Sequence, residues 1–265
     1  MLELYHWEPN IFFLKPLIAL AEKAAPYRGH YFDPTSFEQF AAGFPANTES
    51  KLQLEREGPV LVAEGAILTS SFFVLEYIAE NCAGPTLLPA AAYDRYRARA
   101  WGQRIALSVA GAVTTLGCAR YLTPLLQARP AAPLRAAIAS IEPLDRRAAW
   151  EALLEADRSG ALESARGQLA APLRRIEAAL AAERWLAGPA YSIADIDAYA
   201  MLAPLPELAP ELVNASVSPR IIEFLERVHS RPAVRAALAM TISVIGESPD
   251  GGYRLCGRPT RIKKG

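Results

Sequence analysis

The chain has 265 residues, of which 52% are hydrophobic and 21% are charged, a length that suits one large domain or two small ones. Its 28 basic and 28 acidic residues cancel, so charge gives no reason to expect binding to nucleic acid or to an anionic membrane. No apolar run approaches the roughly 18–20 residues that span a bilayer. Glu3 stands where a signal peptide has basic residues, and we expect a cytoplasmic protein.

Reactive side chains are few and scattered. The three cysteines, Cys82, Cys118 and Cys256, have no CxxC spacing, which predicts neither a disulfide framework nor a zinc site. The three histidines are equally scattered, and no HExxH, GxSxG, GxGxxG or P-loop pattern occurs. We therefore expect no metal. If the protein is an enzyme, its reactive group arrives with a cosubstrate.

Residues 1–82 alternate between short strands and helices. Period-two patterns and turn signals predict strands at 2–5, 27–32, 59–63 and 66–68. Helical spacing runs from Leu14 to Ala21, and Glu64-Gly65 is a tight hairpin signal. Ser70 or Ser71 is expected to cap the helix that follows. The predicted order is β-α-β, a long connection, and then β-β-α.

The remainder of the chain is predicted to be all-helical. A linker rich in Gly and Pro is expected at 83–93, a helical domain at 94–247 and a basic tail at 248–265. The expected helices are 94–121, 166–183, 192–203 and 219–239, with breaks at Pro124, Pro130, Pro133 and Pro143. The predicted fold class is thus α/β plus all-α.

A small βαβ-ββα domain followed by an all-helical domain resembles the glutathione S-transferases. Pro59 at the start of a strand, with the hairpin and Thr69-Ser70-Ser71 behind it, is the first feature that carries the resemblance. The second is Ser192-Ile193-Ala194-Asp195, which looks like the buried capping box of that family. The third is a set of three segments, 1–5, 14–20 and 33–39, which is similar to the bacterial glutathione-dependent β-etherases.

The resemblance implies a thioredoxin-like N-terminal domain, a cis bond before Pro59 and glutathione as cosubstrate. In β-etherases the glutathione thiolate attacks the carbon that bears an aryl ether next to a ketone and expels a phenolate. Glutathione would then contact Lys15, Gly58, Pro59, Ser70 and Ser71, with Gly58 offering its backbone. The aromatic substrate would lie against a second set of residues: Phe12, Phe13, Trp101, Cys118 and Tyr121.

The glutathione site departs from the family pattern at three places. In the related etherases a Ser or Asn just before the Leu-Lys-Pro segment contacts the thiol. This chain has Phe12 and Phe13 there, so only a backbone N–H could substitute. The loop 47–58 is longer and more charged, and Ser70 stands where the family has an acid. We infer a weakened or lost glutathione site, and the catalytic residue stays unknown.

Each feature also has a simpler interpretation. Phe12, Phe13, Trp101, Cys118 and Tyr121 fit ordinary core packing, and Lys15 fits a surface position or a contact to a ligand carboxylate. An arginine-rich stretch fits a solvated helix face as well as an anion-binding strip: Arg95, Arg97, Arg99 and Arg104.

Three functions remain open. The chain is a β-etherase subunit in a homodimer or heterodimer, a non-catalytic partner of a related catalytic subunit, or a carrier of hydrophobic aromatic ligands.

Overall fold

The computed structural model describes residues 1–8, 10–41, 43–46, 58–142, 144–155 and 158–240, together with the backbone of two short strands near the C-terminus. Most of the charged loop expected at 47–58, as well as Pro143 and Cys256, lies outside these residues. The basic tail at 248–265 also lies outside them, except for the paired backbones of β5 (Arg254–Leu255) and β6 (Arg258–Pro259).

The N-terminal part contains a mixed four-stranded sheet in the order β2-β1-β3-β4. Its strands are β1 (Leu2–His6), β2 (Tyr27–Tyr31), β3 (Val60–Ala63) and β4 (Ala66–Leu68). β1 runs parallel to β2 through the crossover helix α1 (Leu14–Glu22), and it runs antiparallel to β3, which pairs with β4 in a hairpin. At Glu64 and Gly65 this hairpin turns through positive φ angles, as its sequence signal predicts.

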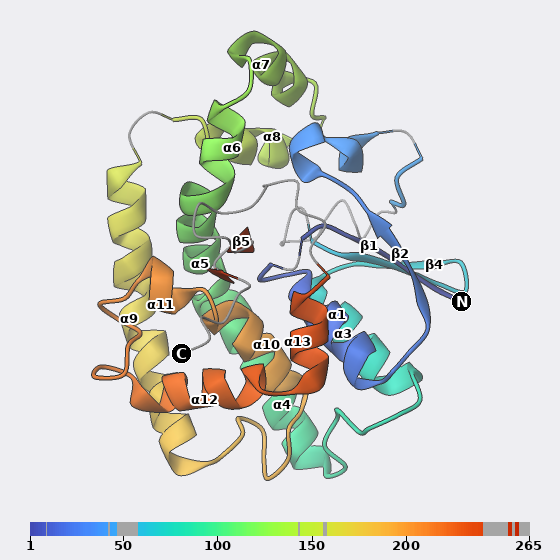
Figure 1. The fold of residues 1–265 in the computed structure, drawn as a ribbon, viewed down its shortest axis with the longest axis vertical. Coiled ribbons are helices and arrows are strands. Elements are labelled where there is room, and N and C mark those ends of the chain that lie inside the picture. Colours follow the sequence, from blue (N-terminus) through green and yellow to red (C-terminus); the bar gives the residue numbers. More distant parts are fainter. Residues whose placement is uncertain are drawn as a thin grey trace.

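Two helices cover one face of this sheet and join it to the rest of the molecule. Seven consecutive residues of α1, from Leu14 to Leu20, are buried. α1 packs against α3 (Ser71–Asn81), and both contact α10 (Ile193–Leu202) of the helical part. Figure 1 shows α1 and α3 below the sheet, with α13 (Pro232–Leu238) alongside α1. One continuous apolar core therefore runs from β1 through α1 into the helical part.

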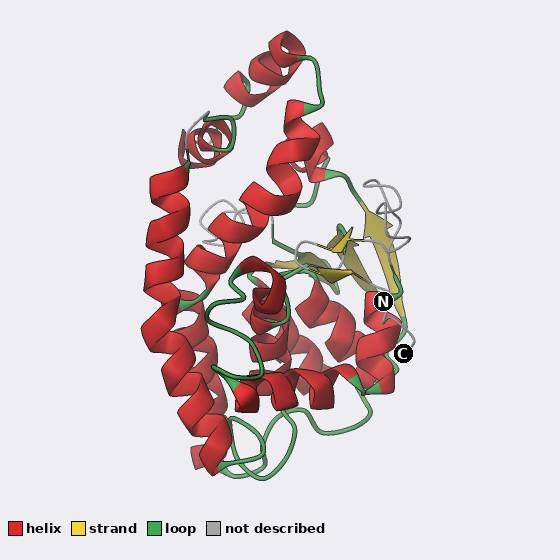
Figure 2. Ribbon diagram, turned by 60° about the vertical axis from the view of Figure 1, so that its left-hand side comes forward, coloured by secondary structure: helices red, strands yellow, loops and turns green. Residues whose placement is uncertain are grey.

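A long helix of the helical part, α9 (Ser159–Ala182), forms one edge of the molecule in Figures 1 and 2. The other helices are α4 (Ala92–Ser108), α5 (Ala110–Gly117), the π-helical turn η3 (Cys118–Leu122), α6 (Thr123–Gln127), α7 (Ala131–Ala139), α8 (Leu144–Ala152), α11 (Leu205–Leu208) and α12 (Pro219–His229). Among the described residues no single helix has the length and apolar composition of a membrane span, although α4 and the stretch Ala110–Gln127 meet that test as a pair bent by 48°.

Several predicted helix boundaries are wrong. The helix expected at 94–121 ends at Ser108 and resumes as α5, η3 and α6, whereas α7 and α8 were not predicted at all. Pro124 is the second residue of α6 and Pro133 the third residue of α7. Because the first turn of a helix leaves its N–H groups without intrahelical partners, a proline there is tolerated. These two prolines mark helix starts, not breaks. The helix expected at 219–239 divides into α12 and α13 before Pro232.

The two predicted helix caps differ in the structure. Ser192 and Asp195 form a reciprocal capping box at the start of α10, where Asp195 also accepts a hydrogen bond from the Leu186 N–H at 2.9 Å. Ser70 occupies the N-cap position of α3, but its side chain makes no capping hydrogen bond, and its φ of 67° lies in the left-handed region. Such a φ strains a residue that has a Cβ atom by about 1–3 kcal/mol. Ser70 therefore does not cap α3 through its side chain, and Ser71 is the first residue of the helix, not the N-cap residue.

Candidate functional site

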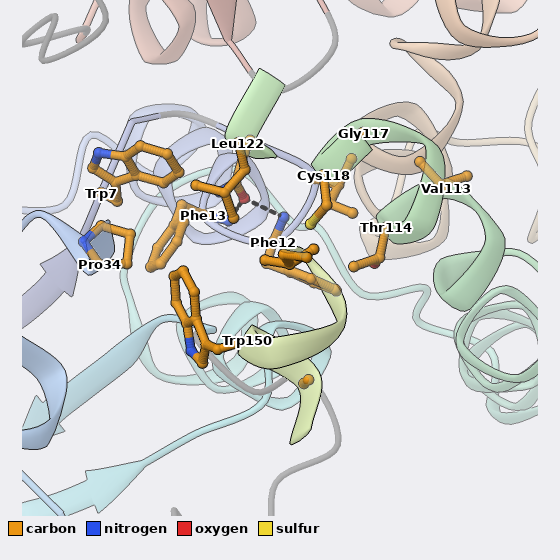
Figure 3. A pocket seen from close by; sticks show the side chains of 14 residues that line it. Trp7, Phe12, Phe13, Pro34, Val113, Thr114, Gly117, Cys118, Leu122 and Trp150 are labelled. Carbon is orange, nitrogen blue, oxygen red and sulfur yellow. Dashed lines mark hydrogen bonds between the residues drawn. The ribbon is translucent and has the colours of Figure 1, made fainter. Parts of the chain in front are cut away.

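A pocket lies where the sheet domain meets the helical part (Figure 3). It encloses about 780 Å³ of space free of protein atoms, part of it open to solvent. Four segments supply the walls: the loop between β1 and α1, the short 3-10 turn η1 (Pro34–Ser36), the stretch from α5 to η3, and α8 with the residue after it. The described lining residues are Trp7, Asn10, Ile11, Phe12, Phe13, Pro34, Val113, Thr114, Gly117, Cys118, Leu122, Ala149, Trp150 and Leu153.

Aromatic rings dominate the pocket, and no described lining residue carries a charge. Phe13 packs edge-on against Phe32 at 5.8 Å between ring centroids, and Trp150 packs edge-on against Phe37 at 5.1 Å. In Figure 3 Trp150 reaches toward Phe13, whereas Cys118 and Thr114 lie on the side of Phe12. Because these rings are fixed by their neighbours, the pocket presents a preformed surface to a flat apolar ligand.

Asn10 organises the loop that carries Phe12 and Phe13. Its side-chain Oδ1 accepts hydrogen bonds from the Phe12 N–H at 2.8 Å and from the Phe13 N–H at 3.1 Å. The Leu14 N–H donates to the Asn10 main-chain oxygen at 2.9 Å. An asparagine side chain commonly satisfies free N–H groups in this way ahead of a helix. The backbone donors of Phe12 and Phe13, which the sequence left open as thiol contacts, are thus already engaged.

The η1 side of the pocket is tied to the helical part by Arg129. Asp33 caps η1 by accepting from the Thr35 N–H at 2.8 Å and from the Thr35 hydroxyl at 2.7 Å. Arg129 lies just after α6, and its guanidinium donates to the Thr35 hydroxyl at 2.8 Å and to the Thr35 main-chain oxygen. It lies 3.5 Å from an Asp33 carboxylate oxygen. This network holds Pro34 in position as a pocket wall.

Lys15 lies in the interior, not on the surface. Its Nζ atom is 2.7 Å from Asp197 Oδ1 on α10, and both side chains are only 2% exposed. The same ammonium group lies 5.6 Å from the centroid of the Phe12 ring. Lys15 is not among the described residues that line the pocket. The surface position that the sequence allowed for it is therefore wrong.

The other residues expected to contact glutathione gather at one end of the sheet. The register pairs Tyr5 with Val60 and Leu61 with Leu68, which brings Pro59 and Ser70 to the end where β1 runs into the pocket loop. Gly58, Pro59 and Ser71 are buried, and neither these three residues nor Ser70 line the aromatic pocket. No described peptide bond is cis, so the cis bond expected before Pro59 is absent; a trans bond is the lower-energy form of most X–Pro pairs.

Of the five residues expected in the substrate pocket, Phe12, Phe13 and Cys118 line it. Trp101 and Tyr121 are buried in the main core and do not line it, because at these positions α4 and η3 turn toward the helical interior. Asn10, Trp7 and Trp150 line the pocket as well but were not among the predicted site residues. Asn10 carried a usable signal, since an asparagine ahead of an apolar helix is a preferred cap.

The remaining candidates have structural partners. Arg97 pairs with Glu183 at 2.8 Å and Arg99 with Glu76 at 2.6 Å. Arg95 donates to the main-chain oxygens of Pro89 and Ala90, and the Arg104 guanidinium lies 5.3 Å from the centroid of the Trp101 ring. Burial raises the pKa of the Cys82 thiol, which disfavours a nucleophilic thiolate. Burial also lowers the pKa of His6, whose ring bonds to the Trp7 main-chain oxygen. In the part of the chain that the structure describes, no three His, Cys, Asp or Glu side chains are grouped as metal ligands.

Comparison with known proteins defines the class of fold. Residues 141–232 match the family model of the glutathione S-transferase C-terminal domain. The crystal structure of the β-etherase LigF from Sphingobium sp. strain SYK-6 matches with a TM-score of 0.81 at 24% identity, over 91% of this chain and 99% of LigF. Glutathione S-transferase III in its apo form matches with a TM-score of 0.65 at 21% identity, over 91% and 97%. The chain has the glutathione S-transferase fold.

Sequence comparison leads to the same relative. Protein LigF of Sphingobium sp. (strain NBRC 103272 / SYK-6) is 25% identical over 240 residues, which cover 88% of this chain and 91% of LigF. A probable glutathione S-transferase of Nicotiana tabacum is 39% identical, but only over 62 residues, or 23% of this chain and 28% of that protein. The predicted resemblance to the glutathione S-transferases and to their β-etherase branch is confirmed.

Proposed function

We propose that this chain is a subunit of a glutathione-dependent transferase that cleaves β-aryl ethers of neutral aromatic compounds. The observation that carries the proposal is the uncharged aromatic pocket at the domain junction, in a chain similar to a β-etherase over most of its length. An aryl ether with two aromatic rings fits such walls better than a charged ligand, which would lose its hydration there.

The proposed reaction is a substitution at carbon. The glutathione sulfur forms a bond to the carbon next to the ketone while the bond from that carbon to the aryl ether oxygen breaks. The electron pair leaves with the phenolate, which then takes up a proton, and no net oxidation or reduction occurs. The aromatic walls would hold both rings while the thiolate approaches, a contribution through positioning.

We further propose that the glutathione site of this chain is weakened. The Phe12 and Phe13 side chains offer no donor to a thiolate, and their N–H groups both bond to Asn10 Oδ1. Ser70 has no carboxylate to pair with the γ-glutamyl ammonium group. These observations favour a second candidate function, in which the chain supports a related catalytic subunit in a dimer and has little activity of its own.

The assay for the proposed function mixes the purified chain with glutathione and 2-phenoxy-1-phenylethanone. We expect phenol and the glutathione thioether in equal amounts, measured by liquid chromatography and mass spectrometry, and neither product without glutathione. Trp150→Ala should lower kcat/KM by roughly 10- to 100-fold by removing a positioning wall. Leu144→Ala, on the exposed face of the same helix α8, should not.

Calorimetric titration of glutathione separates the two candidates. Binding together with turnover identifies a self-sufficient etherase. Absence of binding and of turnover contradicts independent activity and favours the supporting subunit, which should then co-purify with a related chain. If aromatic ethers bind but no related chain co-purifies and no turnover occurs, the protein is a carrier of aromatic ligands.

A further inference from the structure

The described lining of the pocket contains one side-chain amide, that of Asn10. The orientation of this amide is determined by its neighbours. Two N–H groups, those of Phe12 and Phe13, donate to one of its terminal atoms, which must therefore be the oxygen. The Nδ2 group is then the part of the amide that remains for the pocket, and it has no acceptor among the described residues.

The other polar side chains of the described lining offer less to a ligand. The Thr114 hydroxyl donates to the Ala110 main-chain oxygen at 2.7 Å, so its hydrogen is engaged within α5. Figure 3 shows the indole nitrogen of Trp7 on the side of its ring away from Phe12. Cys118 contributes only a weak S–H donor. Asn10 therefore places two N–H donors against otherwise apolar walls, where a hydrogen bond is stronger than in water.

We propose that Asn10 determines the specificity of this pocket: its Nδ2 amide binds an acceptor oxygen, such as a ketone, on an uncharged aromatic ligand. The inference rests on the proposed function and adds to it a residue that selects the carbonyl-bearing substrate. Such a donor rejects a ligand that lacks the oxygen, because Nδ2 would then be covered without a partner. The opposite chemistry, a ligand that only donates, gains nothing from this group.

The test is Asn10→Asp, which changes the donor into an acceptor and leaves the loop cap in place. A carboxylate oxygen can still accept from the N–H groups of Phe12 and Phe13, and its charge suits a position ahead of α1. Binding of three ligands is measured by ligand-observed NMR without glutathione: 2-phenoxy-1-phenylethanone, the matching alcohol, and the analogue with CH₂ in place of the carbonyl. We expect the ratio of ketone to CH₂-analogue affinity to fall by roughly 3- to 10-fold in the variant.

If Asn10 had only a structural role, its replacement would weaken the binding of all three ligands by the same factor. Replacement of the donor by an acceptor should also make the alcohol the preferred ligand, which loss of structure does not explain. Thr114→Val alters the same pocket but removes no free hydrogen-bond donor, so this variant should keep the wild-type order of ligand affinities. If Asn10→Asp does not fold, Asn10→Ser retains a capping oxygen and withdraws the amide, and it should lose the ketone preference.

An unchanged ratio of ketone to CH₂-analogue affinity in the folded Asn10→Asp variant would overturn the inference. A raised pKa of the bound glutathione thiol with that ratio unchanged would also overturn it, since the amide would then serve the sulfur. These outcomes can be told apart from failure of the proposed function alone. If only the proposed function is wrong, Asn10→Asp still inverts the order of ligand affinities as expected, but glutathione-dependent release of phenol is absent.

Discussion

Lys15 and Asp197 form an ion pair in the interior of the molecule. Each side chain is 2% exposed, and the two charged atoms lie 2.7 Å apart. Removal of two charges from water costs several kcal/mol for each ion, and their attraction offsets that cost only while both are present. Since Lys15 belongs to α1 and Asp197 to α10, the pair links the sheet domain to the helical part.

Removal of one charge should therefore cost more than removal of both. We expect Lys15→Met to lower the free energy of unfolding by about 3–5 kcal/mol, because the Asp197 carboxylate remains buried without the lysine cation. The double variant Lys15→Met with Asp197→Leu should recover most of this loss. Urea unfolding of the wild type, both single variants and the double variant gives the coupling energy. A single-variant cost below about 1 kcal/mol would contradict a structural role for the pair.

At the scale of an element, the start of α10 depends on one buried carboxyl group. Asp195 accepts hydrogen bonds from the Leu186 N–H, the Ser192 N–H and the Ser192 hydroxyl, at 2.9, 2.9 and 3.2 Å. Burial raises the pKa of this carboxyl from 3.8 to about 6, although these hydrogen bonds and Arg227 act in the opposite direction. The folded state consequently holds the Asp195 proton more tightly than the unfolded chain does.

The sign of the pH dependence follows from that difference. The contribution of Asp195 to stability is full below pH 3.8 and is lost as the pH rises through about 6, by up to about 3 kcal/mol. Asp195→Asn removes this titration, so the substitution should be more destabilising at pH 4 than at pH 7. Unfolding free energies of both proteins at pH 4, 5, 6 and 7 check this. A cost that is constant or grows with pH would refute the assignment.

At the scale of the whole molecule, an apolar face is exposed on α3 and α4. Phe73 is 64% exposed, and Tyr93 and Tyr96, whose rings stack at 5.9 Å, are 70% and 60% exposed. The Arg99–Glu76 ion pair at 2.6 Å ties the two helices together. Large aromatic side chains are enriched at protein interfaces. If the chain forms the dimer proposed above, we expect Phe73, Tyr93 and Tyr96 to lie in its interface.

Charges on that face should separate the subunits. We expect Phe73→Glu combined with Tyr96→Glu to convert a dimer of the wild-type chain, or its complex with a related chain, into monomers in light scattering after gel filtration. Leu144→Glu is the matched control, since Leu144 is 72% exposed on α8, at the end of the molecule opposite α4 (Figure 1). Dissociation by the control and not by the double variant would place the interface elsewhere.

Local sequence patterns were sufficient for much of the fold. The succession of strands and helices along the sheet domain, the hairpin at Glu64-Gly65 and the capping box of α10 each depend on residues close together in the chain, and all three are present in the structure. Patterns of this kind did not find α7 and α8, because their helical residues lie among prolines that sequence reasoning treats as breaks. Trp150, which α8 contributes to the pocket, was missed for that reason.

By itself, then, the sequence determined the class of fold, the order of its elements and the resemblance to glutathione S-transferases, since all three rest on local periodicity and short motifs. The tertiary structure determined the features that depend on residues far apart in the chain. It buried Lys15 against Asp197 and gathered the pocket walls from four separated segments. Both outcomes depend on contacts that form only when the helical part packs against the sheet, and no local periodicity encodes them.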